Sequence, residues 1–270
     1  MRLRGLGWAG LELETDGQTV VIDHVVDTGF LSAIFGDPRD ELISPEPGRA
    51  RAALLTHLHR DHADVAAIEA ALAGDGVVLR PARKRAESSL DEAATGEAEA
   101  ALAASRLRVY ASEPGDVFEI GPFAITALPA SDGLGSPQVS WLVKADSQTM
   151  LHAGDTLWHG GWWDVVAGHG PIDLAFLPAN GAEIAFPQWQ PAATVPAVMT
   201  PEQAVDAARA LQARSLVPIH YNRTFEHPDY YRPVPDARER LEDLADRHGI
   251  AVRFLEPGDW VDAGFAATPT

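Results

Sequence analysis

The sequence predicts an α/β fold, because short apolar segments typical of buried strands alternate with segments of helical periodicity. The apolar strands repeatedly end in polar motifs, as in Pro218-Ile219-His220-Tyr221. Functional residues commonly lie on loops at the ends of rigid strands. The 270 residues contain no evident linker and no exact internal repeat, so we expect one domain over residues 1–270.

The first elements are predicted to be a β-hairpin and a third strand. Residues 8–14 and 18–23 flank Asp16-Gly17, a strong turn dipeptide, and are expected to pair. The third strand covers residues 52–56. A helix is expected to follow directly after it, over residues 63–73, with Gly74 as its stop signal.

The middle of the chain is expected to begin with helix and to continue with strands. The Ala- and Glu-rich residues 83–105 predict one or two helices with a solvated charged face. Four short strands follow, over residues 117–120, 123–128, 141–144 and 149–152.

The last third alternates strands and helices. Thr200-Pro201-Glu202-Gln203 resembles a capping box with proline at the first helical position, and predicts a helix reaching about Arg214. The other expected elements are buried strands over 174–177 and 216–219, a helix over 236–247 and a strand over 251–255.

Composition excludes several classes of function. Asp and Glu outnumber Lys and Arg by 39 to 21, giving a formal charge of −18, which repels phosphate backbones and disfavours a general nucleic-acid partner. There is no cysteine, so disulfides and thiolate metal sites are absent. The sequence has no apolar run of about 18 residues, which a transmembrane helix would require. We therefore expect a soluble cytoplasmic protein.

The most informative motif is Thr56-His57-Leu58-His59-Arg60-Asp61-His62. Imidazole suits zinc, iron and manganese, and a carboxylate favours the latter two. His57 and His59 lie two residues apart on an extended segment and point to the same side. Asp61 and His62 follow in a turn and are placed to face a second ion. A polar surface turn is the alternative interpretation.

Other strand ends carry metal-type residues. Asp132 lies in Leu128-Pro129-Ala130-Ser131-Asp132-Gly133, and Asp155 lies in His152-Ala153-Gly154-Asp155-Thr156. His220 follows the strand over 216–219. Together with the histidine motif, four strand ends are therefore candidates for one metal centre.

These motifs resemble the H-x-H-x-D-H signature and strand ends of the metallo-β-lactamase superfamily of metal-dependent hydrolases. Gly7-Trp8-Ala9-Gly10 and Val20-Val21-Ile22-Asp23 are similar to its opening hairpin. The resemblance covers nearly the whole chain and implies a four-layer αββα sandwich with two divalent metal ions (Zn, Mn or Fe). Ala-Ser-x-Gly and Ala-Gly-Asp-Thr resemble the branch with ascorbate-6-phosphate lactonase and N-acyl-phosphatidylethanolamine phospholipase D.

The resemblance implies a ligand set by position. It assigns His57 and His59 to metal site one, and it makes Asp155 the carboxylate that bridges both ions. Site two then consists of Asp61, His62, Asp155 and His220.

Asp132 departs from the pattern, because the family usually has a histidine there, in a Ser-His-Gly context. A carboxylate can still ligate, and it would favour manganese or iron over zinc. Alternatively, Asp132 is only a turn residue before Gly133, and site one is weakened or empty.

Other residues near these motifs have both a functional and a structural interpretation. His159, four residues beyond Asp155, is placed to contact substrate, whereas His152 and Asp23 are expected to be structural or to support a ligand. Aromatic residues either wall a pocket or fill the core: Trp158, Trp162, Trp163, Phe186 and Trp189.

The predicted function is hydrolysis of a small ester, lactone or phosphodiester by a hydroxide bridging the two ions, which lower the pKa of water. Asp61 or His159 would supply a proton to the leaving group. The alternatives are an RNase Z-like nuclease and a metal-binding protein that has lost catalysis through Asp132. We expect a small-molecule substrate, no nucleic acid and no membrane span, with assembly into a homo-oligomer left open.

Overall fold

Two seven-stranded sheets pack face to face in the computed structural model, which describes all residues except 40, 84–88, 135–136, 186–193, 222–224 and 265–270. The first sheet has the order β17-β1-β2-β3-β4-β5-β6. Its strands are β1 (Arg2–Gly7), β2 (Gly10–Thr15), β3 (Gln18–Ile22), β4 (Ala50–Leu54), β5 (Leu72–Pro81), β6 (Arg108–Ser112) and β17 (Val261–Asp262).

The second sheet has the order β16-β14-β11-β10-β9-β8-β7. Its strands are β7 (Val117–Ile120), β8 (Phe123–Pro129), β9 (Val139–Ala145), β10 (Gln148–His152), β11 (Leu174–Pro178), β14 (Ser215–Ile219) and β16 (Ala251–Val252). A small third sheet pairs β13 (Thr194–Pro196), β12 (Glu183–Ala185) and β15 (Tyr231–Arg232).

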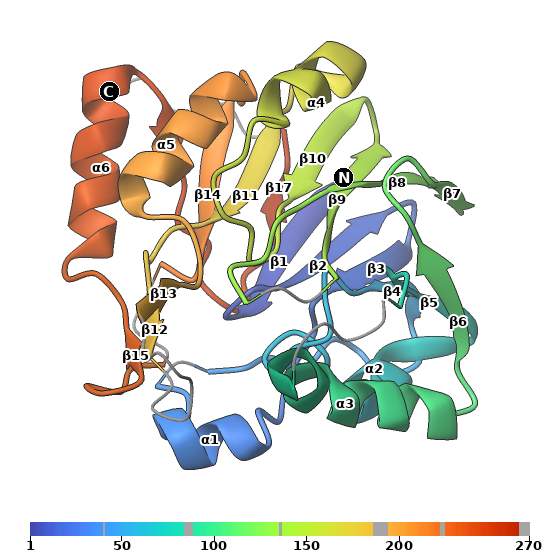
Figure 1. Cartoon of the computed structure of the whole chain (residues 1–270). Helices are drawn as coiled ribbons and strands as arrows, with labels where there is room; N and C mark the ends of the chain where they lie inside the picture. Colours follow the sequence, from blue (N-terminus) through green and yellow to red (C-terminus); the bar gives the residue numbers. More distant parts are fainter. Residues whose placement is uncertain (40, 84–88, 135–136, 186–193, 222–224, 265–270) are drawn as a thin grey trace.

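Helices cover the outer faces of both large sheets (Figure 1). The first sheet packs on α2 (Val65–Ala71) and α3 (Ser89–Ala104), and the second on α4 (Trp162–His169), α5 (Pro201–Ala210) and α6 (Ala237–His248). The short α1 (Phe30–Phe35) lies beside the small sheet in Figure 1. This arrangement confirms the predicted αββα sandwich.

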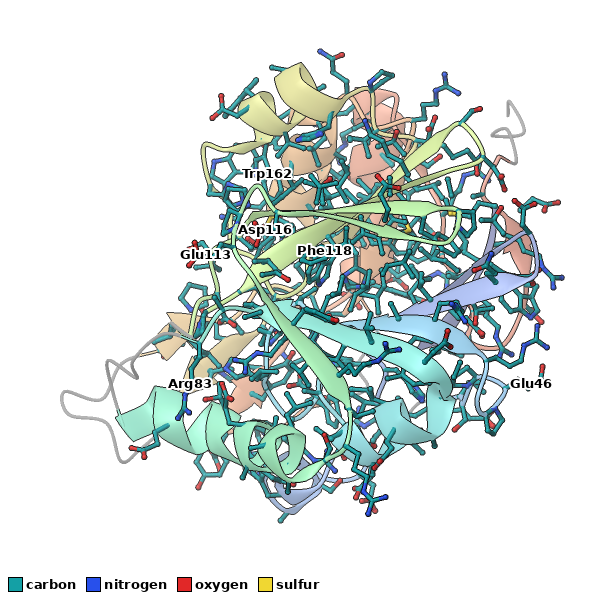
Figure 2. All side chains as sticks on the ribbon, turned by 90° about the vertical axis from the view of Figure 1, so that its right-hand side faces the viewer. Glu46, Arg83, Glu113, Asp116, Phe118 and Trp162 are labelled. Carbon is teal, nitrogen blue, oxygen red and sulfur yellow. The ribbon has the colours of Figure 1, made fainter. Side chains whose placement is uncertain are left out.

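The core between the sheets follows from strand alternation. Val20 and Ile22 of β3 face the second sheet, whereas Val21 between them faces the helices. From the second sheet, Trp141 and Phe176 fill the same interior. Charged residues such as Glu46 and Arg83 remain at the periphery of the molecule (Figure 2). Among the described residues, no helix is long and apolar enough to cross a membrane.

The predicted hairpin is confirmed as β2 and β3, joined at Asp16 and Gly17 with φ values of 51° and 70°. Both residues are therefore left-handed, as a two-residue type I′ hairpin turn requires. The helix predicted to reach residue 73 ends earlier, at Ala71, because Leu72 becomes extended and pairs with Ala50 at the start of β5. The helix predicted to reach Arg214 ends at Ala210.

Thr200 caps α5. Its side chain accepts a hydrogen bond from the backbone N–H of Gln203, and the Gln203 side chain accepts one from the backbone N–H of Thr200. We therefore expect Thr200→Ala to lower the free energy of unfolding by about 1 kcal/mol, measured by chemical denaturation. Thr200→Ser keeps the acceptor and should leave it near the original value. Equal stability of all three proteins would contradict the capping role.

Candidate metal centre

Four loops bring the seven predicted ligands together. The histidine motif follows β4, and the other loops follow β8, β10 and β14. In the second sheet, β8 and β10 are both antiparallel to β9. Strand β10 pairs in parallel with β11, and β11 pairs in parallel with β14. The carboxyl ends of β8, β10 and β14 therefore lie at one edge of the sheet, where they meet the loop that follows β4.

The ligands form two groups, each with its candidate ligand atoms within 4.8 Å of one another. The first group is His57, His59 and Asp132, and the second is Asp61, His62, Asp155 and His220. These groups have the same division into sites one and two that the resemblance to the superfamily implied, with Asp155 in the second group.

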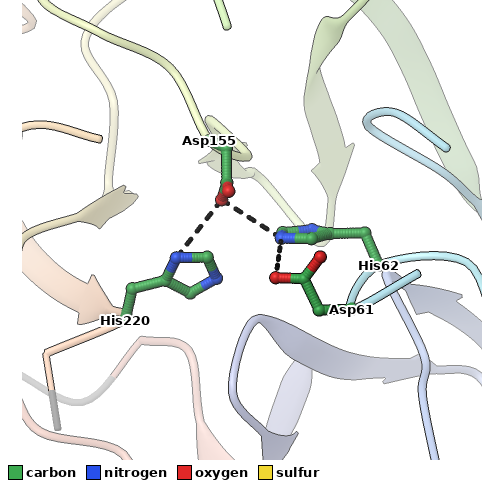
Figure 3. A group of neighbouring side chains, drawn as sticks. All are labelled: Asp61, His62, Asp155 and His220. Atoms are coloured by element: carbon green, nitrogen blue, oxygen red, sulfur yellow. Dashed lines mark ion pairs between the residues drawn. The ribbon is translucent and has the colours of Figure 1, made fainter. Parts of the chain in front are cut away.

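Asp155 faces both imidazoles of the second group (Figure 3). Its Oδ1 is 3.1 Å from His62 Nε2 and 3.3 Å from His220 Nδ1. Asp61 Oδ2 approaches His62 Nε2 at 3.7 Å from the other side. Three separate segments thus direct two imidazoles and two carboxylates at one point.

Asp132 faces both imidazoles of the first group. Its Oδ2 is 3.7 Å from His57 Nε2 and 3.6 Å from His59 Nδ1, while Oδ1 accepts a hydrogen bond from the backbone N–H of Leu134. One oxygen of the carboxyl group therefore stabilises the turn, and the other faces the two histidines. Burial raises its pKa, because exclusion of water disfavours the charged form of the carboxyl group.

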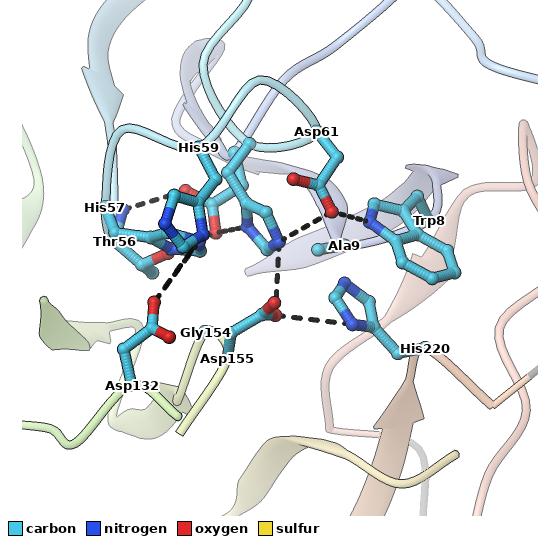
Figure 4. Close-up of polar contacts among 12 residues, drawn as sticks. Trp8, Ala9, Thr56, His57, His59, Asp61, Asp132, Gly154, Asp155 and His220 are labelled. Carbon is cyan, nitrogen blue, oxygen red and sulfur yellow. Dashed lines mark hydrogen bonds and ion pairs between the residues drawn. The ribbon is translucent and has the colours of Figure 1, made fainter. Parts of the chain in front are cut away.

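The two groups are neighbours (Figure 4). The rings of His57 and His62, one from each group, have centroids 4.1 Å apart. The charge of Asp132 contributes to raising the pKa of Asp155, so the two carboxylates interact across the groups. Asp155 is thus placed where one carboxylate can serve two ions.

Several buried nitrogen and oxygen atoms of the two groups are suited to ligate a pair of cations. Within the described part of the chain, His57 Nε2, His220 Nε2 and Asp155 Oδ1 are buried and make no hydrogen bond. Leaving such atoms unsatisfied destabilises a protein by about 1–3 kcal/mol each. Imidazole nitrogens and carboxylate oxygens that converge in this way are the usual ligands of first-row divalent metals.

The electrostatics of the centre favour cations as well. Burial lowers the pKa of His57 and His220 well below the usual value, so both rings are neutral and can donate a lone pair. Burial also raises the pKa of Asp155 to about 6. Burial alone would lower the pKa of His62, but the charges of Asp155, Asp23 and Asp61 outweigh it and raise that pKa well above its usual range. A bound cation would replace the proton held there.

Asp23 supports His62, as expected for a structural acid. Its Oδ2 accepts a hydrogen bond from His62 Nδ1 at 2.8 Å and from Thr56 Oγ1 at 2.6 Å, and Oδ1 accepts one from Thr56 N–H at 2.8 Å. With Nδ1 occupied, the lone pair of His62 is on Nε2, the atom that faces Asp155. This is the carboxylate–histidine arrangement that orients metal ligands.

Gly154 lets the chain turn from β10 into Asp155. It has a φ of +63°, and a Cβ atom there would meet Thr56 side-chain atoms at 2.7 Å. The Asp155 N–H then donates to Gln138 Oε1 at 3.0 Å. The close approach of this turn to the histidine motif therefore depends on glycine.

The remaining candidates have varied positions. His152 is fully buried, and its Nε2 donates to the Ala9 carbonyl, which confirms a structural role. His159 packs on Trp162 with ring centroids 4.0 Å apart, so its contact with substrate stays a prediction. Trp162 is buried in the core between the second sheet and its helices, whereas Trp158 and Trp163 are partly exposed. Phe186 and Trp189 lie outside the described residues.

Sequence reasoning missed Trp8 as a residue of this centre. Its indole N–H donates to Asp61 and its ring packs on His220. The contacts join residues far apart in the chain, and an aromatic residue next to a glycine gives no signal of such a role.

Comparison with known families supports this description. The family described as beta-lactamase superfamily domain matches residues 18–221, which include every predicted ligand. The chain belongs to the metallo-β-lactamase superfamily. The two-sheet, four-layer fold is therefore that of a superfamily member.

One relative with a curated description is similar over nearly the full length of both chains. A UPF0173 metal-dependent hydrolase from Thermococcus kodakarensis is 29% identical over 267 residues, covering 96% of this chain and 98% of the relative. The chain is therefore a metal-dependent hydrolase of this superfamily.

Solved structures share the fold. A metallo hydrolase from Ignicoccus hospitalis has a TM-score of 0.63 at 20% identity and covers 96% of this chain and 97% of its own. CmlA, a diiron β-hydroxylase from Streptomyces venezuelae, has a TM-score of 0.70 at 20% identity, covering 96% of this chain and 53% of its own. At these identities the likeness concerns the fold alone.

Proposed function

We propose that this metal-dependent hydrolase holds two divalent ions between its two ligand groups and cleaves a small ester, lactone or phosphodiester. The carrying observation is the convergence of seven ligand side chains into adjacent groups, with Asp155 between them. The motifs Ala130-Ser131-Asp132-Gly133 and Ala153-Gly154-Asp155-Thr156 support the lactonase and phosphodiesterase branch of the superfamily.

The position of each residue determines which ion it would hold. When bound, the two ions would lower the pKa of water, supply hydroxide at neutral pH and polarise the oxygen under attack. His57, His59 and Asp132 would hold one ion, His62, His220 and Asp61 the other, and Asp155 both. Asp23 keeps the His62 ring in the ligating tautomer.

Two side chains are candidates for moving a proton to the leaving group. The Asp61 side chain is 18% exposed, more than the 13% of Asp155, so it is the more accessible carboxylate of its group. His159 accepts the Gly161 N–H at Nδ1, and burial lowers its pKa, so its neutral ring carries one proton, at Nε2, and can donate a hydrogen bond there. Asp61 would transfer a proton only as the protonated carboxyl group, and His159 only as the doubly protonated ring, which would first have to release the Gly161 N–H.

The donor set favours harder ions. Asp132 makes site one two imidazoles plus a carboxylate, a combination suited to manganese or iron as well as zinc. The diiron relative in fold is consistent with iron in this scaffold. The net charge of −18 counts against a nuclease, and the position of Asp132 against His57 and His59 argues against a degenerate site one.

The test is reconstitution. Protein stripped with a chelator is reloaded with Zn²⁺, Mn²⁺ or Fe²⁺ and assayed on lactones, carboxylic esters, phosphodiesters and single-stranded RNA. We expect activity on one small-molecule class, dependent on metal and lost in His220→Ala. Cleavage of RNA alone would support the nuclease alternative, and metal-independent turnover would contradict the proposal.

A further inference from the structure

Trp8 contacts ligands of site two from two directions (Figure 4). It lies between β1 and β2 and is 8% exposed. Its Nε1 donates to Asp61 Oδ2 at 3.0 Å. Its ring stacks on His220 with centroids 3.8 Å apart and planes inclined by 20°. One side chain of the N-terminal turn therefore joins the histidine motif to the loop after β14.

The hydrogen bond fixes one carboxylate oxygen without neutralising it. Asp61 Oδ2 is the same atom that faces His62 Nε2. A neutral indole N–H occupies one lone pair of that oxygen and leaves another directed at the ligand group. A cationic donor in its place would compete with a metal ion for the charge, whereas the indole does not.

The stacking fixes the plane of the His220 imidazole. Rotation about the Cβ–Cγ bond decides whether Nδ1 faces Asp155 Oδ1, now 3.3 Å away. The indole covers one face of the ring and restricts that rotation, while Phe225 packs its ring against Trp8 at 86°.

The backbone of both partners is strained. Trp8 has a φ of 54° and His220 a φ of 51°. For residues with a bulky side chain this left-handed region costs about 1–3 kcal/mol, and it persists where surrounding contacts determine it. The stack thus joins two strained positions, which is typical of a functional site rather than of ordinary core packing.

We propose that Trp8 is the positioning residue of metal site two, holding Asp61 by its N–H and His220 by its ring. The proposal rests on the proposed function, because it assumes that Asp61 and His220 ligate an ion. It assigns the N-terminal turn a role in metal affinity that the ligands alone do not supply.

The experiment compares four variants with the unmodified protein by titrating metal-stripped protein with Zn²⁺ in a calorimeter. Trp8→Phe keeps the stacked ring and removes the N–H, and Trp8→Leu removes both. The matched control is Trp141→Phe, at a fully buried indole whose N–H makes no hydrogen bond among the described residues. His220→Ala identifies which binding step belongs to site two.

We expect Trp8→Phe to weaken the site-two step by about 10-fold and Trp8→Leu by up to about 100-fold, as changes behind metal ligands do. The site-one step and the control should match the unmodified protein. Unchanged binding in Trp8→Phe would overturn the proposal and leave the proposed function standing. Equal weakening of both steps, in parallel with a lower unfolding midpoint, would also overturn it. If the unmodified protein binds none of Zn²⁺, Mn²⁺ and Fe²⁺, the proposed function itself fails.

Discussion

Asp155→Asn is expected to weaken both metal sites together and to abolish nearly all hydrolysis. The amide keeps the shape of the carboxyl group but removes the charge that lies between His62, His220 and the first group. Changes behind ligands already reduce affinity by 10–100-fold, so loss of a shared ligand should exceed about 100-fold at each site. Calorimetric titration with Zn²⁺ and with Mn²⁺ measures both steps.

The matched control for this variant is Asp164→Asn, which makes the same change at an exposed position in the first turn of α4. It should bind two ions with unaltered affinity. Loss of one ion alone in Asp155→Asn would show that Asp155 belongs to a single site, and the bridging assignment would then be wrong.

Asp132→Ala is expected to empty site one and to leave site two loaded. Its carboxylate faces His57 and His59, and no residue of the second group depends on it for a hydrogen bond that the structure shows. Metal content should therefore fall from two ions to one, with activity reduced at least about 100-fold. Elemental analysis after dialysis measures the content.

Asp132→Asn separates the ligand role from the turn, because its carbonyl can still accept the Leu134 N–H while the charge is gone. It should resemble Asp132→Ala in metal content and the unmodified protein in stability. Asp132→His should restore two ions and shift preference toward zinc. Unaltered metal content and activity in Asp132→Ala would leave a one-metal or degenerate superfamily member as the better description.

The elements that the sequence predicted well have local signals. The hairpin depends on the adjacent residues Asp16 and Gly17, and α5 on the reciprocal bonds of Thr200 and Gln203. The strand ends also gave a local signal for the candidate ligands, whereas their division into two sites came from the resemblance to the superfamily. Polar motifs followed apolar strands, and parallel strands bring their carboxyl ends to one edge.

Features that depend on distant partners were missed. β1 contains Arg2, Arg4 and two glycines, and becomes a strand through pairing with β2 and β17. The short strands β12, β13 and β15 pair across long stretches of chain and have no periodicity to detect. Helix α4 was not predicted either, since no side-chain cap marks its first turn. The contacts of Trp8 with Asp61 and His220 are of the same kind, since only the folded chain brings these residues together.

The central claim is that this chain holds two divalent ions in adjacent groups that share Asp155. The most direct measurement is elemental analysis of protein purified without a metal-binding tag, after incubation with Zn²⁺, Mn²⁺ and Fe²⁺ and removal of excess metal. We expect close to two transition-metal ions per chain, and one or fewer in His62→Ala and His220→Ala. Retention of both ions in either variant, or no retained ion in the unmodified protein, would contradict the two-site centre.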